Sequence, residues 1–296
     1  MRVGIDIGGT KCLGVMLDPK GEVVAEARVP TPSTTLTLLD VLVDLATRFE
    51  EPSSLGVGFP GLMNSNGEVG ASAHLADVQS QPLRARLAAR LHDMQLDFPV
   101  VIDNDATAAT LAEWKVGAGR GIDDLVMVTL GTGIGGGFVL GGRLYRGARG
   151  FAGEIGHAVI MLDGRPCPCG RRGCWERYAS GTALAEAAGT ATGEDAVVAA
   201  RAGNPTAMRA FADFTRAVAI GLANIVNIVD PAVIVLGGGL IELGDELLEP
   251  VRDDLAAVLY GSDHREIPRI VPAELGERAG AIGAAMLPER QSTGSR

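Results

Sequence analysis

The sequence lacks any concentration of positive charge. It has 26 Lys and Arg residues against 36 Asp and Glu, a net charge of −10 at pH 7, and its longest basic run is the pair Arg171-Arg172. An acidic chain repels nucleic acid and anionic membranes unless it carries a local basic patch. We therefore expect no nucleic acid and no membrane among its partners.

Long apolar runs and a secretory signal are missing as well. No stretch approaches the roughly 18 apolar residues that a membrane span needs, and the chain runs from Met1 straight into a strand pattern. These absences predict a cytoplasmic protein. Cysteines are few, four in 296 residues, and in a reducing compartment a cluster of them indicates a metal or catalytic site more often than disulfides.

Glycine, in contrast, is abundant, with 41 residues. Two similar strand–turn–strand units are built around it: residues 3–17, with the turn Gly8-Gly9-Thr10, and residues 125–140, with a turn that begins Gly131-Thr132-Gly133. The repetition indicates an internal duplication of one lobe. The rest of the pattern is that of an α/β protein, with helices expected at residues 36–48, 83–91, 105–114, 211–229 and 279–287, and strands at 23–29, 55–59, 100–102, 138–140 and 233–236.

The second turn contains G-x-G-x-x-G at Gly131, Gly133 and Gly136. A dinucleotide-binding fingerprint of this form requires a helix directly after the glycines, whereas residues 138–142 read as a strand and a turn. We favour a phosphate-binding hairpin over residues 131–137, in which successive backbone N–H groups surround an anion; a purely structural hairpin is the alternative. No G-x-x-x-x-G-K-[ST] motif exists, which excludes a P-loop protein.

The first turn follows a strand that contains one acid, Asp6, among apolar residues. A strand carboxylate that faces a phosphate turn suits Mg²⁺, directly or through water; a hydrogen-bonded turn carboxylate is the alternative. Lys11 could approach a phosphate or simply be solvated. The motif Asp103-Asn104-Asp105 ends a strand and begins a helix, which fits an ordinary N-cap but also the strand end where α/β folds bind ligands.

The most specific local signal is a cluster of three cysteines, Cys167, Cys169 and Cys174, with His157 upstream. Cys₃His is a closed tetrahedral zinc set. Two acids, Glu154 and Glu176, flank the cluster. If zinc holds one ring nitrogen of His157, the other nitrogen and the two carboxylates can meet a polyhydroxylated ligand, although each acid could also be a surface residue. Cys12 stands alone and is expected to be a small buried side chain.

These motifs together resemble the ROK family (repressors, open reading frames, sugar kinases), within the actin/hexokinase-like, ribonuclease H-like two-lobe ATPase fold. The matching segments are Asp6–Lys11, Gly58–Gly61, Asn104-Asp105, Leu130–Gly137, Glu154–His157, Cys167–Glu176 and Leu236–Gly239. The run Gly173–Gly181 looks most like the bacterial glucokinase branch. The resemblance implies ATP-dependent phosphorylation of the 6-hydroxyl of glucose, with another hexose (fructose, mannose, N-acetylglucosamine or N-acetylmannosamine) as the alternative.

The resemblance also implies a role for each motif. Asp105 would be the general base. Sugar contacts are expected from Gly61, Asn104, Asp105, Glu154, His157 and Glu176. ATP and Mg²⁺ contacts are expected from Asp6, Gly8, Gly9, Thr10, Lys11, Gly131, Thr132, Gly133, Gly238 and Gly239, the last two beside the adenosine. Polyphosphate is an alternative phosphoryl donor. Zn²⁺ is expected at His157, Cys167, Cys169 and Cys174.

Lobe boundaries are expected at residues 1–106, joined by a C-terminal helix at 281–296, and at 107–280, with the zinc-binding segment at 157–176. A homodimer or homotetramer is expected from the family. A regulator with a DNA-binding domain is disfavoured, since only five residues precede Asp6. The chain departs from the family pattern at residues 71–77, where His74 occupies a position that resembles an Asn in relatives.

Overall fold

A computed structural model describes residues 1–72 and 80–288. The chain forms two compact units. The first contains residues 1–120 and 144–152 and the residues from Leu275 onward, and the second contains residues 121–143 and 153–274. The lobe boundary predicted after residue 106 would divide the helix α3 (Asp105–Val116). The predicted boundaries between the two functional lobes therefore stay a prediction.

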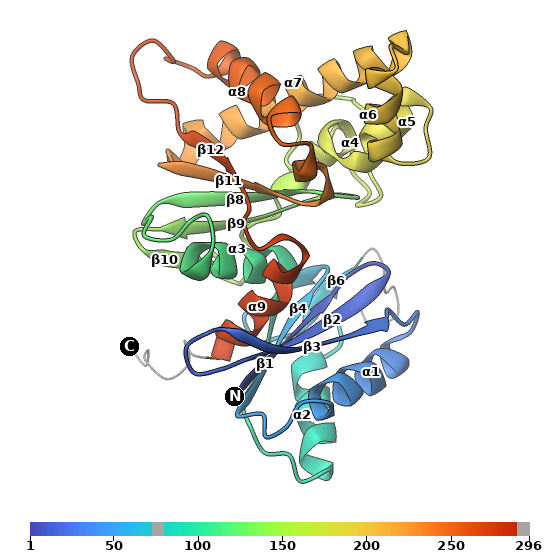
Figure 1. Cartoon of the computed structure of the whole chain (residues 1–296), viewed down its shortest axis with the longest axis vertical. Helices are drawn as coiled ribbons and strands as arrows, with labels where there is room; N and C mark the ends of the chain where they lie inside the picture. Colours follow the sequence, from blue (N-terminus) through green and yellow to red (C-terminus); the bar gives the residue numbers. More distant parts are fainter. Residues whose placement is uncertain (73–79, 289–296) are drawn as a thin grey trace. The chain divides into compact units, whose positions relative to one another are not determined.

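The first unit is built on a five-stranded mixed sheet (Figure 1). Its first three strands are antiparallel neighbours, and the next two are added in parallel on the other side of the first strand. The strand order is β3-β2-β1-β4-β7, with β1 Arg2–Ile7, β2 Lys11–Leu17, β3 Val23–Pro30, β4 Ser54–Phe59 and β7 Val100–Asn104. A separate two-stranded sheet pairs β5 (Leu62–Met63) with β6 (Val69–Ala71).

Side chains of β1 alternate between two faces of this sheet. Val3, Ile5 and Ile7 are fully buried in a core that includes α1 (Thr35–Thr47) and α2 (Leu83–Asp93). The alternate residues, Gly4 and Asp6, face the helix α9 (Ala279–Met286). This two-residue period is what a strand with both faces covered requires.

Close packing of α9 depends on glycines in the elements that it crosses. A Cβ on Gly4 would lie 2.0 Å from the carbonyl oxygen of Ala281, and one on Gly56 in β4 would lie 1.7 Å from that of Ala284. These distances leave no room for a side chain, so helix backbone rests directly on strand backbone. α9 also packs against α3, and Figure 1 shows it beside β1 and β4.

One fully buried acid, Glu113 in α3, holds two loops of the first unit. Its Oε2 accepts a hydrogen bond from the Ala118 N–H at 2.9 Å, and its Oε1 accepts one from the Leu275 N–H at 2.8 Å. Residues 118 and 275 lie next to two of the four places where the chain passes between the first unit and the second. The carboxylate therefore fixes the first-unit ends of both connections.

The second unit repeats the sheet of the first. Its strand order is β10-β9-β8-β11-β12, with β8 and β9 antiparallel and β8, β11 and β12 parallel. Each strand has a counterpart at the same place in the first sheet, which confirms the predicted duplication. The strands are β8 Leu125–Leu130, β9 Ile134–Leu140, β10 Arg143–Tyr145, β11 Val233–Gly237 and β12 Arg269–Pro272.

The predicted return strand at residues 138–140 is too short. β9 begins at Ile134, because Gly135, Gly136 and Gly137 pair with Thr129, Val128 and Met127 of β8. Glycine is a poor strand former, but the neighbouring strand and a helix turn packed on the glycines impose the extended form. The turn itself is therefore residues 131–133 and not 131–137.

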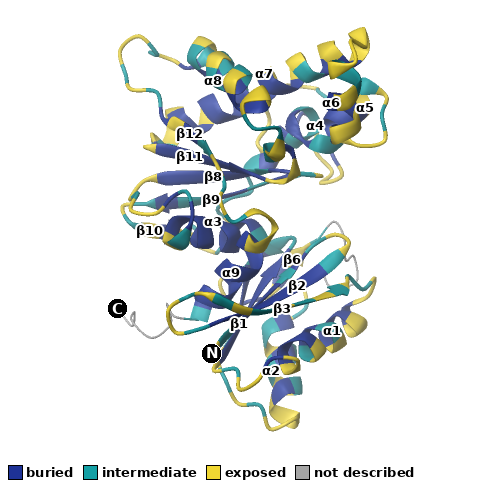
Figure 2. Cartoon of the chain, in the orientation of Figure 1, coloured by how far each residue is buried: buried dark blue, intermediate teal, exposed yellow. Residues whose placement is uncertain are grey.

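The long helix α7 (Pro205–Val229) forms the centre of the second unit, and its buried face packs on the sheet and on shorter helices. Those helices are α4 Glu176–Ala179, α5 Gly181–Ala188, α6 Gly193–Arg201 and α8 Asp245–Val258. α7 is long and apolar enough to cross a membrane by composition, but 56% of that window is buried inside the protein. Figure 2 shows the buried face of α7 in dark blue toward the sheet, as expected of a core helix.

Candidate functional site

In the first unit, Asn104 caps helix α3 at the end of β7. Its Oδ1 accepts the Thr107 N–H at 2.9 Å, and its Nδ2 donates to the Gly61 carbonyl oxygen at 3.3 Å and to Asp105 Oδ1 at 3.0 Å. Gly61 has φ +155°, and a Cβ there would lie 2.4 Å from the Ala71 carbonyl oxygen. The N-cap interpretation is thus correct for Asn104, and the same amide also connects three of the predicted site residues.

Asp105 is the first residue of α3 and not its cap. Its Oδ1 accepts hydrogen bonds from the Ala106 N–H at 2.9 Å and from Asn104 Nδ2. The positive end of the helix dipole favours an ionised carboxylate at this position. The arrangement holds one oxygen of Asp105 in a defined direction at the carboxyl end of the parallel strands, where α/β folds bind ligands.

Asp6 lies on the same side of the sheet, between β1, α3 and the start of α9. A Cβ on Gly58 would lie 3.0 Å from Asp6 Oδ1 and 3.4 Å from Asp105 Cα, and one on Gly280 would lie 2.5 Å from Asp6 Cγ. The residue is only partly covered, but Oδ1 is buried and has no hydrogen-bond partner among the described residues. Burial, reinforced by the charge of Asp105, raises the Asp6 pKa to about 8.

The turn of the first hairpin is held by its own strand and by Thr31. Gly8 N–H donates to the Lys11 carbonyl oxygen, and Thr31 binds the carbonyl oxygens of Gly8 and Thr10 through its hydroxyl and its N–H. Gly9 and Thr10 are exposed at the tip. Lys11 forms an ion pair with Glu277, with its Nζ 2.5 Å from Glu277 Oε2. A contact from Lys11 to phosphate stays a prediction.

In the second unit, the turn at residues 131–133 uses its carbonyl groups within the protein. The Gly131 carbonyl oxygen accepts the Gly181 N–H at 2.7 Å, and the Thr132 carbonyl oxygen accepts the Thr182 hydroxyl at 2.8 Å. Helix α5 thus fixes the turn from behind. A Cβ added at Gly131 would meet nothing within 4 Å, so this side of the turn is open for a ligand to approach the backbone.

The other glycines of that motif serve packing. A Cβ on Gly133 would lie 2.5 Å from Glu176 Oε2, and one on Gly136 would lie 2.2 Å from the side chain of Ile155. Gly238, after β11, has φ +91° and would clash with the Leu130 backbone at 2.2 Å. Close approaches within the protein therefore explain two of the three glycines in the fingerprint-like spacing, Gly133 and Gly136. The strand β9 follows them, whereas a dinucleotide fingerprint requires a helix.

The cysteine cluster forms a compact loop closed by backbone hydrogen bonds and by the bridges Val159–Cys174 and Pro166–Arg172. Ligand atoms of His157, Cys167, Cys169 and Cys174 all lie within 4.8 Å of one another. Cys169 Sγ and Cys174 Sγ are 3.6 Å apart, and Cys167 Sγ is 3.8 Å from His157 Nδ1.

Those separations fit one zinc ion. With zinc–sulfur distances of about 2.3 Å and a zinc–nitrogen distance of about 2.0 Å, the ligands of a regular tetrahedron stand about 3.5–3.8 Å apart. Burial and the adjacent thiols raise the pKa of Cys174 to about 12, so this group would need a nearby cation to be held as a thiolate. The donor set, the spacing and the missing positive charge all suit Zn²⁺.

Two acids and the histidine converge beside this cluster. Glu176 Oε2 accepts the Ile134 N–H at 3.3 Å, and its Oε1 lies 3.9 Å from His157 Nδ1. His157 ends the 3-10 helix η2 (Ile155–His157), which rests on β9 because a Cβ on Gly156 would lie 2.4 Å from the Ile134 carbonyl oxygen. Burial raises the pKa of Glu154; His157 opposes this rise and Glu176 adds to it.

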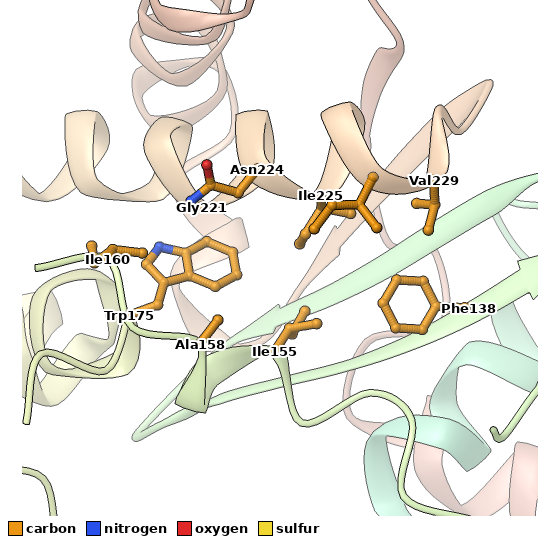
Figure 3. A pocket seen from close by; sticks show the side chains of 10 residues that line it. Phe138, Ile155, Ala158, Ile160, Trp175, Gly221, Asn224, Ile225 and Val229 are labelled. Atoms are coloured by element: carbon orange, nitrogen blue, oxygen red, sulfur yellow. The ribbon is translucent and has the colours of Figure 1, made fainter. Parts of the chain in front are cut away.

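Sequence reasoning missed the support beneath this group, Trp175. The indole Nε1 donates to the Ala217 carbonyl oxygen at 2.7 Å, and the ring covers Gly221, where a Cβ would lie 1.9 Å from it. Figure 3 shows the ring between α7 and the segment that carries Ala158 and Ile160. The adjoining pocket has an empty volume of about 450 Å³ and almost wholly apolar walls, so it is not suited to a sugar.

The predicted residues therefore fall into two groups, each within one unit. Asp6, Gly61, Asn104 and Asp105 are linked by the contacts described above in the first unit, and the 131–133 turn, Glu154, His157, Glu176 and the cysteines are linked in the second. His74 lies outside the described residues. In the first group, Asp6 and Asn104 lie at the ends of β1 and β7, and in the second group the 131–133 turn follows β8, the counterpart of β1 in the duplicated sheet.

This duplicated topology, with a glycine-rich hairpin at the start of each half, defines an α/β protein of the actin/hexokinase-like ATPase fold. The chain belongs to the ROK family, whose profile matches residues 2–291. A solved structure with this fold is that of a ROK family glucokinase from Streptomyces griseus in complex with glucose and AMPPNP. It is 34% identical with a TM-score of 0.86, covering 97% of this chain and 98% of that one.

The relatives of this chain include sugar kinases and a repressor. The chain is 36% identical to glucokinase from Streptomyces coelicolor, with 97% of both chains covered. It is 32% identical to N-acetylgalactosamine kinase AgaK from a Shewanella species, with 97% of this chain and 96% of the relative covered. The xylose repressor of Bacillus subtilis is 29% identical, and the match covers 96% of this chain but 76% of the repressor.

Proposed function

We propose that this protein transfers the γ-phosphoryl group of ATP to the 6-hydroxyl of glucose. The observation that carries the proposal is the Asn104–Asp105 pair, which presents an oriented carboxylate at the carboxyl end of a parallel strand. The similarity to a glucokinase whose complex contains glucose and AMPPNP, an ATP analogue, supports both substrates.

Asp105 acts as the general base toward the sugar hydroxyl. Phosphoryl transfer has a loose transition state, so the proton can leave late and the direction of the carboxylate matters more than its basicity. The hydrogen bonds from Ala106 N–H and Asn104 Nδ2 to Oδ1 supply that direction. Asn104, whose amide also donates to the Gly61 carbonyl oxygen, contacts a neighbouring hydroxyl in this proposal.

Glu154, His157 and Glu176 supply the remaining sugar contacts in this proposal. His157 Nδ1 faces Cys167 and is the ring nitrogen that would hold zinc in a Cys₃His site. Nε2 is then left to bind the sugar, and the side chain is 42% exposed. With four protein ligands, a zinc ion there would be structural: it would fix the imidazole and leave no open coordination position.

The two hairpin turns hold the phosphates, with contacts proposed from residues 8–11 and 131–133, and Gly238 and Gly239 lie beside the adenosine. Asp6 is the residue that fits Mg²⁺, because its buried Oδ1 lacks a partner and its raised pKa indicates missing positive charge. Mg²⁺ neutralises charge on the transferring phosphates when it is bound.

A coupled ADP-release assay with a panel of hexoses tests the proposal. We expect turnover with glucose, and kcat should fall by at least 10²-fold in Asp105→Asn while glucose affinity, measured by calorimetry, changes little. The matched control is Asp213→Asn, an exposed acid of α7, which should behave like wild type. A protein that phosphorylates none of these hexoses would refute the kinase proposal.

Metal analysis tests the zinc site separately. The wild-type protein should contain one zinc per chain, and Cys169→Ala should lose it and bind glucose more weakly through misplacement of His157. Cys12→Ala removes a buried cysteine outside the cluster and should keep its zinc. A zinc-free wild-type protein, purified without chelator, would contradict the site.

A kinase for another hexose is the second candidate, favoured by the 32% identity to an N-acetylgalactosamine kinase. The same sugar panel decides it, since the preferred substrate is the one with the highest kcat/KM. A regulatory role, suggested by the repressor relatives, would show as sequence-specific DNA retention at physiological salt. A cytoplasmic location and a homodimer or homotetramer remain part of the proposal.

A further inference from the structure

An ion pair outside the predicted site lies directly behind the Asn104–Asp105 pair. Arg146 Nε donates to Asp103 Oδ2 at 2.6 Å, and the two side chains are only 29% and 10% exposed. The other oxygen of the same carboxylate, Asp103 Oδ1, accepts the Asn104 N–H at 2.9 Å. Because each oxygen of Asp103 has its own donor, the guanidinium sets the direction in which the carboxylate holds the Asn104 peptide.

Arg146 begins a loop, residues 146–152, that backbone hydrogen bonds close and attach to the rest of the first unit. Its carbonyl oxygen accepts the Ala152 N–H at 3.0 Å, and the Arg149 carbonyl oxygen accepts the Ser65 N–H at 3.1 Å. Gly150, at φ +97°, approaches Ser65 so closely that a Cβ would lie 2.7 Å from its backbone nitrogen. The loop is thus docked on the β5–β6 hairpin, and the chain continues from Ala152 into Gly153 and Glu154.

We propose that Arg146 is a positioning residue for phosphoryl transfer: through Asp103 it orients Asn104 and the base Asp105, and it anchors the loop that leads to Glu154. This inference rests on the proposed function. It adds a residue that is 41 positions from Asp105 in the sequence and that belongs to none of the motifs discussed above.

A purely structural role would give a different result. Breaking a partly buried ion pair destabilises a protein because one charge is left uncompensated. That effect lowers the fraction of folded enzyme, so the apparent kcat falls in proportion to that fraction, while KM and the kcat per folded molecule stay unchanged. Misdirection of a base by about 1 Å can cost 10²-fold in rate. Such a loss appears in the sugar kinetics of fully folded protein.

The experiment compares Arg146→Met, Arg146→Lys and Asp103→Asn with the control Arg149→Met. Arg149 lies in the same loop, is exposed, and carries the same charge. For Arg146→Met we expect kcat/KM for the sugar to fall 10- to 100-fold, with kcat carrying most of the loss and the KM for ATP within two-fold of wild type. Arg146→Lys should recover part of the loss, since it restores the charge without the planar fork.

Asp103→Asn should lose as much kcat/KM for the sugar as Arg146→Met. The double variant should be as active as the less active of the two single variants, because both changes break the same linkage. All variants are assayed at a temperature at which circular dichroism shows them folded. If Arg146→Met fails to fold, Arg146→Lys and Asp103→Asn test the same linkage.

Three results would overturn the inference: Arg146→Met as active as Arg149→Met, losses that multiply in the double variant, or a loss that disappears once the folded fraction is corrected for. Wild-type activity separates this from the proposed function. A wild-type protein that turns over no sugar refutes the proposed function and the inference with it, whereas an active wild type with unaffected variants refutes the inference alone.

Discussion

The buried carboxyl group of Asp6, which we propose for Mg²⁺ binding, should lower the free energy of unfolding, and the size of this effect should depend on pH. The Asp6 carboxyl pKa is about 8 in the folded protein against an ordinary value of 3.8. The folded state therefore keeps the proton while the unfolded chain has already lost it. Between those two values the unfolded state binds fewer protons, so stability falls as pH rises from about 4 to 8 and then levels off.

The size of the effect follows from the size of the shift. About four pKa units at 1.36 kcal/mol each correspond to on the order of 5 kcal/mol, a large part of the 5–15 kcal/mol that is typical of a folded domain. Asp6→Asn removes the titrating group and keeps the shape. We expect the variant to gain stability over wild type steadily across this pH range, by several kcal/mol in total, while losing most of its kinase activity.

Urea unfolding at pH 5.0, 7.0 and 8.5 measures this difference directly. Asp213→Asn, an exposed acid-to-amide change, should follow the wild-type curve. Millimolar Mg²⁺ at pH 8.5 should stabilise wild type more than Asp6→Asn, because the cation supplies the missing positive charge. A stability difference between Asp6→Asn and wild type that stays constant within about 1 kcal/mol from pH 5.0 to 8.5 would refute the reasoning.

Three further variants test the supports of the site. Gly221→Ala places a Cβ 1.9 Å from the Trp175 ring, and chemical denaturation should show a loss of about 1–3 kcal/mol despite the better helix propensity of alanine. Glu113→Gln can accept only one of the two N–H bonds described above, so it should lose about 1–3 kcal/mol. In Cys169→Ala the KM for ATP should rise together with that for the sugar, because Glu176 joins the zinc cluster to the 131–133 turn.

The parts of the molecule that the sequence predicted well are those with local signals. The Cys₃His group was readable because three cysteines within eight positions are rare in a chain with four of them, and the structure brings their ligand atoms within 4.8 Å. The strand before Asp105 and the helix after it were readable from an apolar run followed by capping residues. The duplication was readable because the two hairpins resemble each other.

Contacts between distant segments could not be read in this way. Nothing near Gly4 or Gly56 in the sequence indicates that helix α9 will lie against them. The pairing of Arg146 with Asp103 joins residues 43 positions apart. Helices α5, α6 and α8 were not predicted, although Ser180 and Thr192 cap the first two. All three pack against α7, a contact between segments that no local signal indicates.

Glu176 shows why the zinc cluster cannot be separated from the chemistry in this proposal. One of its oxygens holds the Ile134 N–H, at the end of the turn proposed for phosphate, and the other lies 3.7 Å from Cys167 Sγ and 3.9 Å from His157 Nδ1. Gly133 must be a glycine for the first contact to form. A metal ion at His157 would therefore fix the carboxylate on one side, while the hairpin fixes it on the other. An ion bound by these four ligands would also align the proposed sugar contacts with the proposed phosphate turn, so that a structural zinc would influence the binding of both substrates.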